Sequence, residues 1–236
     1  MSVFLQRKIG LVVCDMAGTI INEKGLIYKT MFNTLKTSGY AVPSSFMDSW
    51  PGKDKKEVLS QAVYHHIGNY KKANEITYDL EKDLIKNLEK EYFKQGNIEL
   101  VDNELLDFFD LLRINGVKVA LNTGYPRQMQ EKIIEHFNLS GHIDNYIYSE
   151  EVACGRPTPY MINRLMEENL IISAKNIAKI GDTKIDMKEG KNAGCGLTIG
   201  VLTGYENKEN LIDSGADIVV NTITDLNNDV FCDFYL

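Results

Sequence analysis

Carboxylate side chains follow two apolar runs of this sequence, where they could act as nucleophiles or metal ligands. Asp15 comes directly after the run 9–14 and opens Asp-Met-Ala-Gly-Thr, which ends at Thr19. Asp182 and Asp186 follow a second run, in Gly-Asp-Thr-Lys-Ile-Asp. A carboxylate on a Gly-containing turn can present an oxygen as a nucleophile, and Mg²⁺ takes such hard oxygen ligands together with water and phosphate oxygens. The two segments therefore indicate phosphoryl-transfer chemistry assisted by a divalent cation.

Two further segments add groups that could neutralise phosphoryl oxygens. Thr123 and Gly124 end another apolar run, and Arg156 lies in a later Gly-Arg-Pro. A hydroxyl, a guanidinium and the backbone N–H groups of Gly18 and Thr19 supply the positive electrostatics that phosphoryl transfer needs. Each segment alone is common turn chemistry, but four in succession at the ends of apolar runs are improbable by coincidence. We predict that Thr123 and Arg156 are catalytic, and that Gly18, Thr19 and Gly124 bind substrate.

Short β-branched runs in front of these segments predict the strands of a parallel sheet. The expected strands are 9–15, 117–122, 146–148, 178–180, 197–201 and 217–220. Helical patterns lie between them, at 103–114, 127–137, 160–168, 187–193 and 206–213. This alternation is typical of an α/β fold with an open, parallel, Rossmann-like sheet and right-handed crossovers. Side chains at the carboxyl ends of such strands converge, so the four segments should meet.

A long helical segment interrupts the alternation after the first strand. Helices are expected at 28–36, 54–66 and 71–94, and the last carries an apolar residue at every fourth position. An insertion after the carboxyl end of a strand lies above the crevice in which α/β sheets bind ligands. We therefore predict two domains, an α/β core of residues 1–22 and 97–236 and an all-helical cap of residues 23–96.

These four segments, in this order, resemble those of the haloacid dehalogenase (HAD) superfamily of hydrolases, and the resemblance covers essentially the whole chain. It implies that Asp15 is the nucleophile that forms an aspartyl-phosphate. It also implies that Mg²⁺ is held by Asp15, the main-chain carbonyl of Ala17 and Asp182. It further implies that Asp186 orients the metal shell and that Thr123 binds phosphate. Arg156 takes the place of the family's usual lysine.

Three longer blocks resemble the phosphonatase branch, the phosphonoacetaldehyde hydrolases. They are Asn-Thr-Gly-Tyr-Pro-Arg at 122–127, Cys-Gly-Arg-Pro-Thr-Pro-Tyr-Met at 154–161, and the block 181–194. Ala17 stands where most family phosphatases carry an Asp that protonates the leaving oxygen. Cleavage of a C–P bond expels a carbanion, which needs an electron sink instead of an acid. In this branch a cap lysine provides the sink as a Schiff base, and the resemblance places that lysine at Lys55.

Two observations keep an alternative open. Lys53, Lys55 and Lys56 form a charged run of the kind that usually faces solvent, and Val58 stands where phosphonatase has a cap histidine. The alternative is a phosphatase acting on a small, reactive phosphate ester or anhydride without a Schiff-base lysine. A catalytically idle scaffold is a third hypothesis, and retention of the acidic and basic motif residues argues against it.

Composition narrows the class of protein. In 236 residues, 26 Lys+Arg against 33 Asp+Glu give a formal net charge of −7, which disfavours sequence-independent binding of nucleic acid. No apolar run approaches the roughly 18 residues of a membrane-spanning helix. Four scattered cysteines, Cys14, Cys154, Cys195 and Cys232, favour reduced thiols. We expect a cytoplasmic enzyme with a small phosphorylated or phosphonylated substrate and no nucleic-acid or membrane partner; the cap helices could support a homodimer, as the resemblance suggests.

Overall fold

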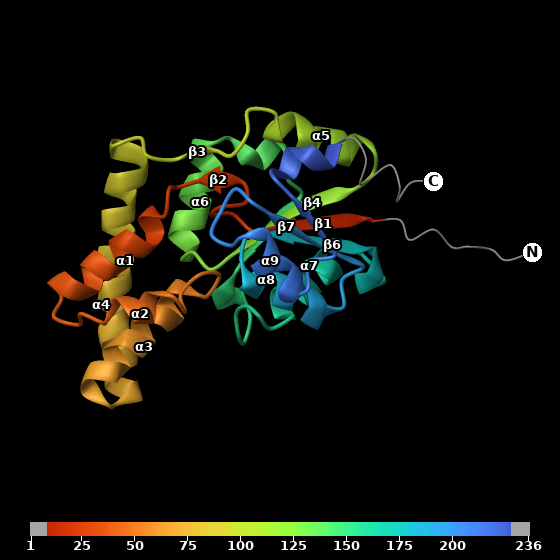
Figure 1. Cartoon of the computed structure of the whole chain (residues 1–236). Coiled ribbons are helices and arrows are strands. Elements are labelled where there is room, and N and C mark those ends of the chain that lie inside the picture. The colour runs from red at the N-terminus through yellow and green to blue at the C-terminus, as the bar shows by residue number, and fades with distance from the viewer. Residues whose placement is uncertain (1–8, 228–236) are drawn as a thin grey trace, which may run out of the picture.

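Six parallel strands form the central sheet of the computed structural model, which describes residues 9–227 (Figure 1). The strand order is β5-β4-β1-β6-β7-β8. The strands are β1 (Leu11–Cys14), β4 (Lys118–Thr123), β5 (Asn145–Tyr148), β6 (Ile177–Gly181), β7 (Leu197–Val201) and β8 (Ile218–Val220). This sheet confirms the predicted α/β, Rossmann-like fold, and it places β1, which leads to Asp15, between β4 and β6.

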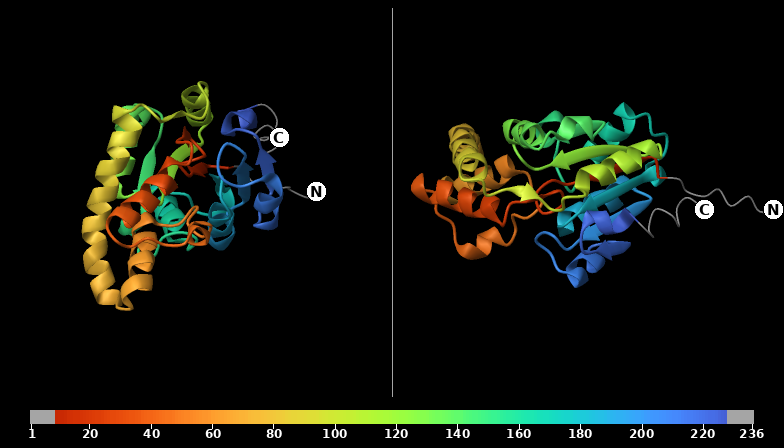
Figure 2. Two further views of the ribbon diagram at one scale, coloured as in Figure 1. Left: turned by 60° about the vertical axis from the view of Figure 1, so that its left-hand side comes forward. Right: turned by 90° about the horizontal axis from the view of Figure 1, so that it is seen from above.

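Helices cover both faces of the sheet, as Figure 2 shows. They are α5 (Leu105–Ile114), α6 (Arg127–His136), α7 (Tyr160–Glu168), α8 (Lys184–Ala193) and α9 (Lys208–Asp213). Side chains of β1 alternate between two apolar layers, because successive residues of a strand face opposite sides. Val12 and Cys14 pack in one layer with α5 and α6, while Leu11 and Val13 pack in the other with α7. Apolar packing therefore holds the strands in place from both faces.

A helical layer built from residues 26–94 projects beyond one end of the sheet (Figure 1). Its helices are α1 (Leu26–Thr37), α2 (Ser44–Met47), α3 (Lys55–Ile67) and α4 (Tyr70–Glu89), and α4 continues as the π-helix η1 (Lys90–Lys94). Leu80, Leu84 and Leu88 form the buried stripe of α4, against which α1 and α3 pack. The layer lies where the cap is expected; its bounds as a domain, 23–96, stay a prediction.

Two short strands, which the sequence pattern does not predict, join the helical layer to the sheet. β2 (Ile21–Asn22) pairs antiparallel with β3 (Glu99–Leu100). The Asn22 side chain donates to Glu99 Oε1 at 3.1 Å, and Lys24 Nζ lies 3.4 Å from the same oxygen. Two residues are too few to show the alternation by which a strand is recognised.

The predictions about free cysteines and membrane-spanning helices can be compared with the described residues. Cys14, Cys154 and Cys195 are free thiols, and Cys232 lies outside the described residues. Within residues 9–227, none of the helices has both the length and the hydrophobicity that crossing a bilayer would require.

Candidate active site

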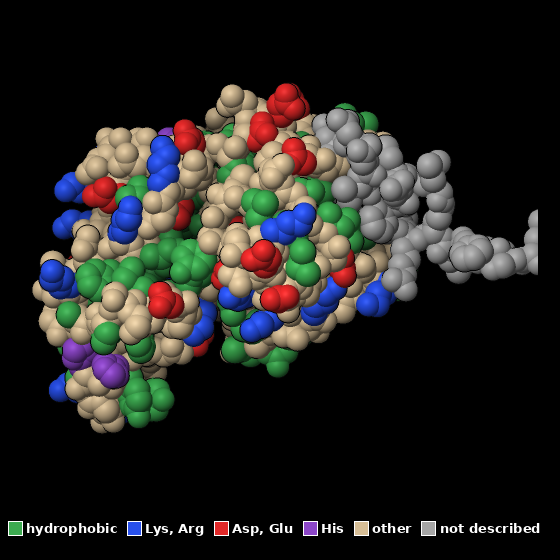
Figure 3. Space-filling view, in the orientation of Figure 1, with side chains coloured by type: hydrophobic (Ala, Val, Ile, Leu, Met, Phe, Trp, Pro, Cys, Tyr) green, Lys and Arg blue, Asp and Glu red, His purple; other side chains and the backbone are tan. Residues whose placement is uncertain are grey.

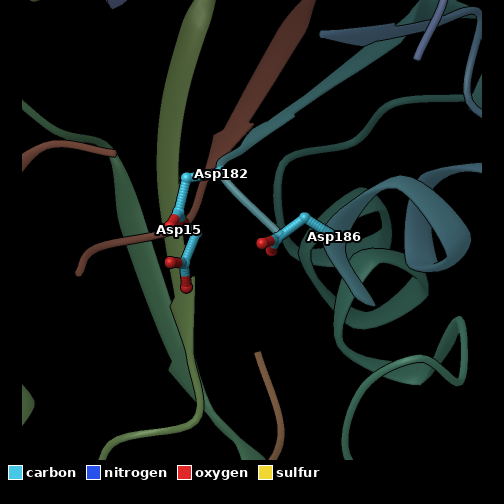
Figure 4. A group of neighbouring side chains, drawn as sticks. All are labelled: Asp15, Asp182 and Asp186. Carbon is cyan, nitrogen blue, oxygen red and sulfur yellow. The ribbon is translucent and has the colours of Figure 1, made fainter. Parts of the chain in front are cut away.

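The register of the sheet brings the three predicted carboxylates to one edge. Cys14, the last residue of β1, pairs with Ile180 near the end of β6, so the residues just beyond both strands are neighbours. One ligand oxygen each from Asp15, Asp182 and Asp186 lies within 4.8 Å of the other two. Figure 4 shows Asp15 and Asp182 side by side at the strand ends, with Asp186 reaching toward them from α8.

Two buried cations contact these carboxylates. Arg156 Nη1 lies 2.6 Å from Asp15 Oδ1 and 2.6 Å from Asp186 Oδ1. Lys179, within β6, lies 3.0 Å from Asp186 Oδ1 and 3.2 Å from Glu189 Oε2. Burial raises the pKa of Asp15, and the Arg156 guanidinium acts against that rise. Burial would also raise the pKa of Asp186, but Lys179 and Arg156 together hold it below its usual value.

The charge balance of this cluster fits a divalent cation. The buried carboxylates are Asp15, Asp182, Asp186 and Glu189, and the buried cations in contact with them are Arg156 and Lys179. Four acids against two bases leave an excess of negative charge, which is costly away from water. Burial and the nearby charge of Asp15 raise the pKa of Asp182 well above its usual range, as expected where like charges crowd. The donor oxygens suit Mg²⁺, so these residues fit the metal.

The turn after β1 corrects one expectation. The N–H groups of Gly18 and Thr19, expected to be free for substrate, donate to the carbonyls of Ile21 and Met16 at 2.8 and 3.2 Å. These two N–H groups are therefore not free, because the turn closes on itself, and substrate binding at Gly18 and Thr19 stays a prediction. The Thr19 hydroxyl donates to Asp182 Oδ1 at 3.3 Å. Gly18 adopts a φ of 78°, and a Cβ there would collide with the Asp182 carboxylate, so the turn orients Asp182.

Other donors at this edge can receive phosphoryl oxygens. The N–H groups of Met16, Ala17 and Gly124 donate to no protein acceptor within residues 9–227. The buried Thr123 hydroxyl accepts from the N–H of Tyr125 at 3.2 Å, which leaves its own proton available to donate. Donors are therefore available at two of the predicted positions, Thr123 and Gly124. In the first turn the available donors are the N–H groups of Met16 and Ala17, which lie two residues closer to Asp15 in the sequence than the predicted pair.

The loop that begins α3 docks against the core at Gly124. The N–H of Lys55 donates to the Gly124 carbonyl at 3.0 Å, and a Cβ on Gly124 would collide with the Lys53 carbonyl. Asp54 caps α3 by accepting from the N–H of Glu57 at 2.7 Å, and its other oxygen accepts from the Ser149 hydroxyl of the core. The capping residue of α3 thus also contacts the core.

The Lys55 side chain is buried at this junction, with 4% of its surface exposed, so the charged run does not place it in solvent. Its Nζ donates to the Lys53 carbonyl at 2.9 Å. The rings of Tyr28 and Tyr125 lie 5.4 and 6.0 Å from Nζ, measured to their centroids. Burial lowers the pKa of Lys55 to about 8, and the charge of Arg156 acts in the same direction.

A cavity of about 180 Å³ adjoins the carboxylates. Its lining includes Ala17, Gly18, Asp182 and Tyr205 from the loops that follow the strands, and Glu23 and Tyr28 from the segment that leads into the helical layer. Figure 3 shows the helical layer and the core meeting along a groove. The cavity is smaller than the pockets that hold drug-sized ligands, which fits a small metabolite.

Sequence reasoning missed a buried network behind Asp186. Lys179 Nζ donates to Asn122 Oδ1 at 2.6 Å, and Asn122 Nδ2 donates to both carboxylate oxygens of Glu189 at 2.9 Å. The signal was present as a lysine inside the apolar strand Ile-Ala-Lys-Ile-Gly, because a buried lysine needs an acidic partner.

Comparisons with known proteins agree with this fold and site. The chain matches the family model described as haloacid dehalogenase-like hydrolase over residues 12–200. The phosphonoacetaldehyde hydrolase of Latilactobacillus sakei subsp. sakei is 30% identical over 209 residues, which are 81% of this chain and 74% of that protein. That of Parabacteroides distasonis is 28% identical over 190 residues, 70% of this chain and 69% of that protein.

A solved structure shares the fold. The crystal structure of a phosphonoacetaldehyde hydrolase-like protein from Oleispira antarctica has a TM-score of 0.81 at 20% identity, over 99% of this chain and 95% of that chain. The chain therefore belongs to the haloacid dehalogenase-like hydrolases. Within them it is a phosphonatase-like enzyme, in agreement with the motifs of its sequence.

Proposed function

We propose that this hydrolase cleaves the C–P bond of a small phosphonate aldehyde, with Lys55 as covalent catalyst and Asp15 as nucleophile. The observation that carries the proposal is a buried lysine that begins α3, docks on Gly124 at the end of β4 and lies near enough to Asp15 for the charge of Asp15 to act on its pKa of about 8. An amine of this pKa is partly neutral near neutrality, as Schiff-base formation requires. Phosphonoacetaldehyde, after which the relatives are named, has both the aldehyde and the C–P bond.

The first step joins Lys55 to the substrate. The neutral Nζ attacks the aldehyde carbon and a C–N bond forms. The carbonyl oxygen takes one proton from Nζ and the proton that Lys55 gave up on becoming neutral, and it leaves as water to give an iminium. The Tyr28 and Tyr125 rings beside Nζ favour this cation, because aromatic faces attract positive charge.

The second step transfers the phosphoryl group to Asp15. Arg156 contacts Asp15 Oδ1, which leaves Oδ2 to attack phosphorus. The new O–P bond forms as the C–P bond breaks, and the C–P electron pair enters the iminium to give an enamine. No proton donor is needed for the leaving carbon at this point, which is consistent with Ala17 in place of an acid. Water then hydrolyses the aspartyl-phosphate.

The donors at the strand ends hold the phosphoryl oxygens during transfer. These are the Thr123 hydroxyl, the Arg156 guanidinium and the N–H groups of Met16, Ala17 and Gly124. Asp15, the Ala17 carbonyl and Asp182 would hold Mg²⁺, with Asp186 orienting the shell of the ion. When bound, Mg²⁺ would neutralise charge on the phosphoryl oxygens. Arg156 and Lys179 keep Asp186 ionised and in place.

Borohydride trapping tests this function. Borohydride added with phosphonoacetaldehyde should irreversibly modify Lys55, as identified by mass spectrometry of peptides. Lys55→Ala should block modification, whereas Lys56→Ala, which removes the neighbouring exposed lysine, should not. Absence of modification, together with hydrolysis of acetyl phosphate that survives Lys55→Ala but not Asp15→Asn, would instead support the phosphatase without a Schiff base. Homodimer formation and a cytoplasmic location stay predictions.

A further inference from the structure

A further buried carboxylate, outside the cluster around Asp15, lines the cavity together with Tyr28, whose ring Lys55 Nζ faces. Glu23, in the linker between β2 and α1, is 6% exposed. Its Oε1 accepts from the N–H of Gly25 at 3.1 Å, and its Oε2 accepts from the N–H of Ile27 at 2.7 Å. In the part of the chain that the structure describes, Glu23 forms no ion pair, whereas Asp15 and Asp186 pair with Arg156. Glu23 is therefore a carboxylate not committed to a cation.

Two tyrosine hydroxyls connect Glu23 to the wall of the site beside Lys55. Tyr92, in η1, donates to Glu23 Oε2 at 3.3 Å, and its hydroxyl lies 2.7 Å from that of Tyr125. All three side chains are buried. The ring of Tyr125 is one of the two that Lys55 Nζ faces. Hydrogen bonds thus connect Glu23 through Tyr92 to the Tyr125 hydroxyl, and the ring of Tyr125 lies beside Lys55 Nζ.

Formation of the proposed Schiff base requires that Lys55 Nζ first lose a proton, and the group to which Nζ donates its hydrogen bond cannot accept that proton. Lys55 Nζ donates to the Lys53 carbonyl, and a carbonyl oxygen of this kind does not take a proton. With a pKa of about 8, most of Lys55 is protonated at neutral pH and must lose a proton before it attacks. Asp15 and Asp182 are assigned to the phosphoryl group and the metal, and Asp54 caps α3.

We propose that Glu23 accepts the proton of Lys55, through the hydroxyls of Tyr92 and Tyr125, and later returns it. The inference rests on the proposed function. Nζ loses a proton to the Glu23 carboxylate and then attacks the aldehyde carbon. The Glu23 carboxyl then returns this proton to the hydroxyl of the carbinolamine, which leaves as water to give the iminium. After the C–P bond breaks, the enamine carbon takes a proton released when water hydrolyses the aspartyl-phosphate, and a second water hydrolyses the resulting iminium to free Lys55 and the aldehyde. Glu23 thus acts first as a general base and then as a general acid in formation of the Schiff base.

Electrostatics supports this exchange. Burial raises the pKa of Glu23, although the charge of Lys55 works against the rise. Burial lowers the pKa of Lys55, although the charges of Asp15, Asp54 and Glu23 work against the fall, while Arg156 adds to it. The pKa values of the acid and the amine therefore approach each other, which makes proton transfer between them easier.

Glu23 also has a structural role, since it accepts N–H groups at the start of α1, and the test must separate the two. Glu23→Gln keeps the length of the side chain and one oxygen, which can accept one of these two hydrogen bonds, but it cannot take a proton. Glu23→Asp keeps the acid on a shorter side chain. A purely structural role predicts that trapping slows in both variants in step with their loss of thermal stability, whereas proton transfer predicts that Gln slows trapping and Asp largely does not.

The experiment measures how fast borohydride traps Lys55 with phosphonoacetaldehyde. We expect Glu23→Gln to slow trapping by about 10²-fold, within the range for general acid–base groups, and Glu23→Asp to recover most of the rate. Glu81→Gln, which alters a mostly buried carboxylate paired with Lys56, should trap at the wild-type rate.

The outcomes distinguish this inference from the proposed function. Trapping in the wild type with an equal rate in Glu23→Gln, or with Gln better than Asp, overturns the role of Glu23 and leaves the function standing. No trapping in the wild type overturns the function and the inference with it. Should Glu23→Gln fail to fold, Tyr92→Phe cuts the hydroxyl chain and leaves the α1 contacts intact; slower trapping supports the inference, and unchanged trapping overturns it.

Discussion

Asp15 and Lys55 act in different steps of the proposed reaction, so a substitution at one of them should block its own step and leave the other step measurable. Asp15→Asn keeps the shape of the side chain but removes the nucleophile, and we expect release of inorganic phosphate to fall by about 10³-fold or more. Borohydride should still trap Lys55 in this variant, because imine formation precedes phosphoryl transfer. Both assays use phosphonoacetaldehyde with Mg²⁺. Phosphate release near the wild-type rate would show that another group attacks phosphorus.

The depressed pKa of Lys55 predicts the pH dependence of trapping. The neutral amine attacks the aldehyde, and protonation below a pKa of about 8 removes it. The trapping rate should therefore rise about tenfold per pH unit up to about pH 8 and level off above it. A rate that keeps rising to about pH 10 would mean that Lys55 has the ordinary pKa of an exposed lysine.

Residues within short motifs were predictable, and residues that meet only in the fold were not. Asp15, Asp182 and Asp186 follow strands, and their convergence results from the parallel sheet alone. The burial of Lys55 could not be predicted, because its local sequence is that of a solvated helix start and only docking against Gly124 encloses it. Glu23 and Tyr92 are 69 residues apart in the sequence, and no local pattern links them.

At the scale of elements, the docking of α3 should couple helix capping to activity. Asp54→Ala removes the N-cap of α3 and the contact with Ser149 of the core. Asn69→Ala is a matched control, because Asn69 caps α4 by accepting from the N–H of Lys72 at 3.0 Å. Each change should lower the free energy of unfolding by about 1 kcal/mol. Only Asp54→Ala should also reduce kcat/KM, because it loosens the loop that carries Lys55.

Thermal unfolding and steady-state kinetics of the two variants check this coupling. Equal losses of kcat/KM in both would mean that general destabilisation, and not the position of the loop, controls activity.

The boundaries of the helices were predictable in part. The start of α8 lies at Lys184 instead of 187, because Thr183 and Asp186 form a capping box that extends the helix by its first turn.

For the whole molecule, the cluster of buried carboxylates should make stability depend on a divalent cation. The carboxylates come from β1, β6 and α8 of the core, so an ion that binds them binds the folded chain and not the unfolded one. At a hundredfold excess over its Kd, Mg²⁺ should add about 2.7 kcal/mol to the free energy of unfolding. For a chain of this size that is a rise in Tm of about 5–10 °C.

Asp182→Asn tests whether the stabilisation comes from this cluster. Asn keeps an oxygen but loses the charge, so Mg²⁺ should no longer raise the Tm, and activity should be lost with it. Asp213→Asn, at the exposed end of α9, removes one charge far from the cluster and should leave the Mg²⁺ effect unchanged. An equal rise in Tm for both variants would mean that the ion acts elsewhere, and the metal ligands assigned to Asp15, Ala17 and Asp182 would then be wrong.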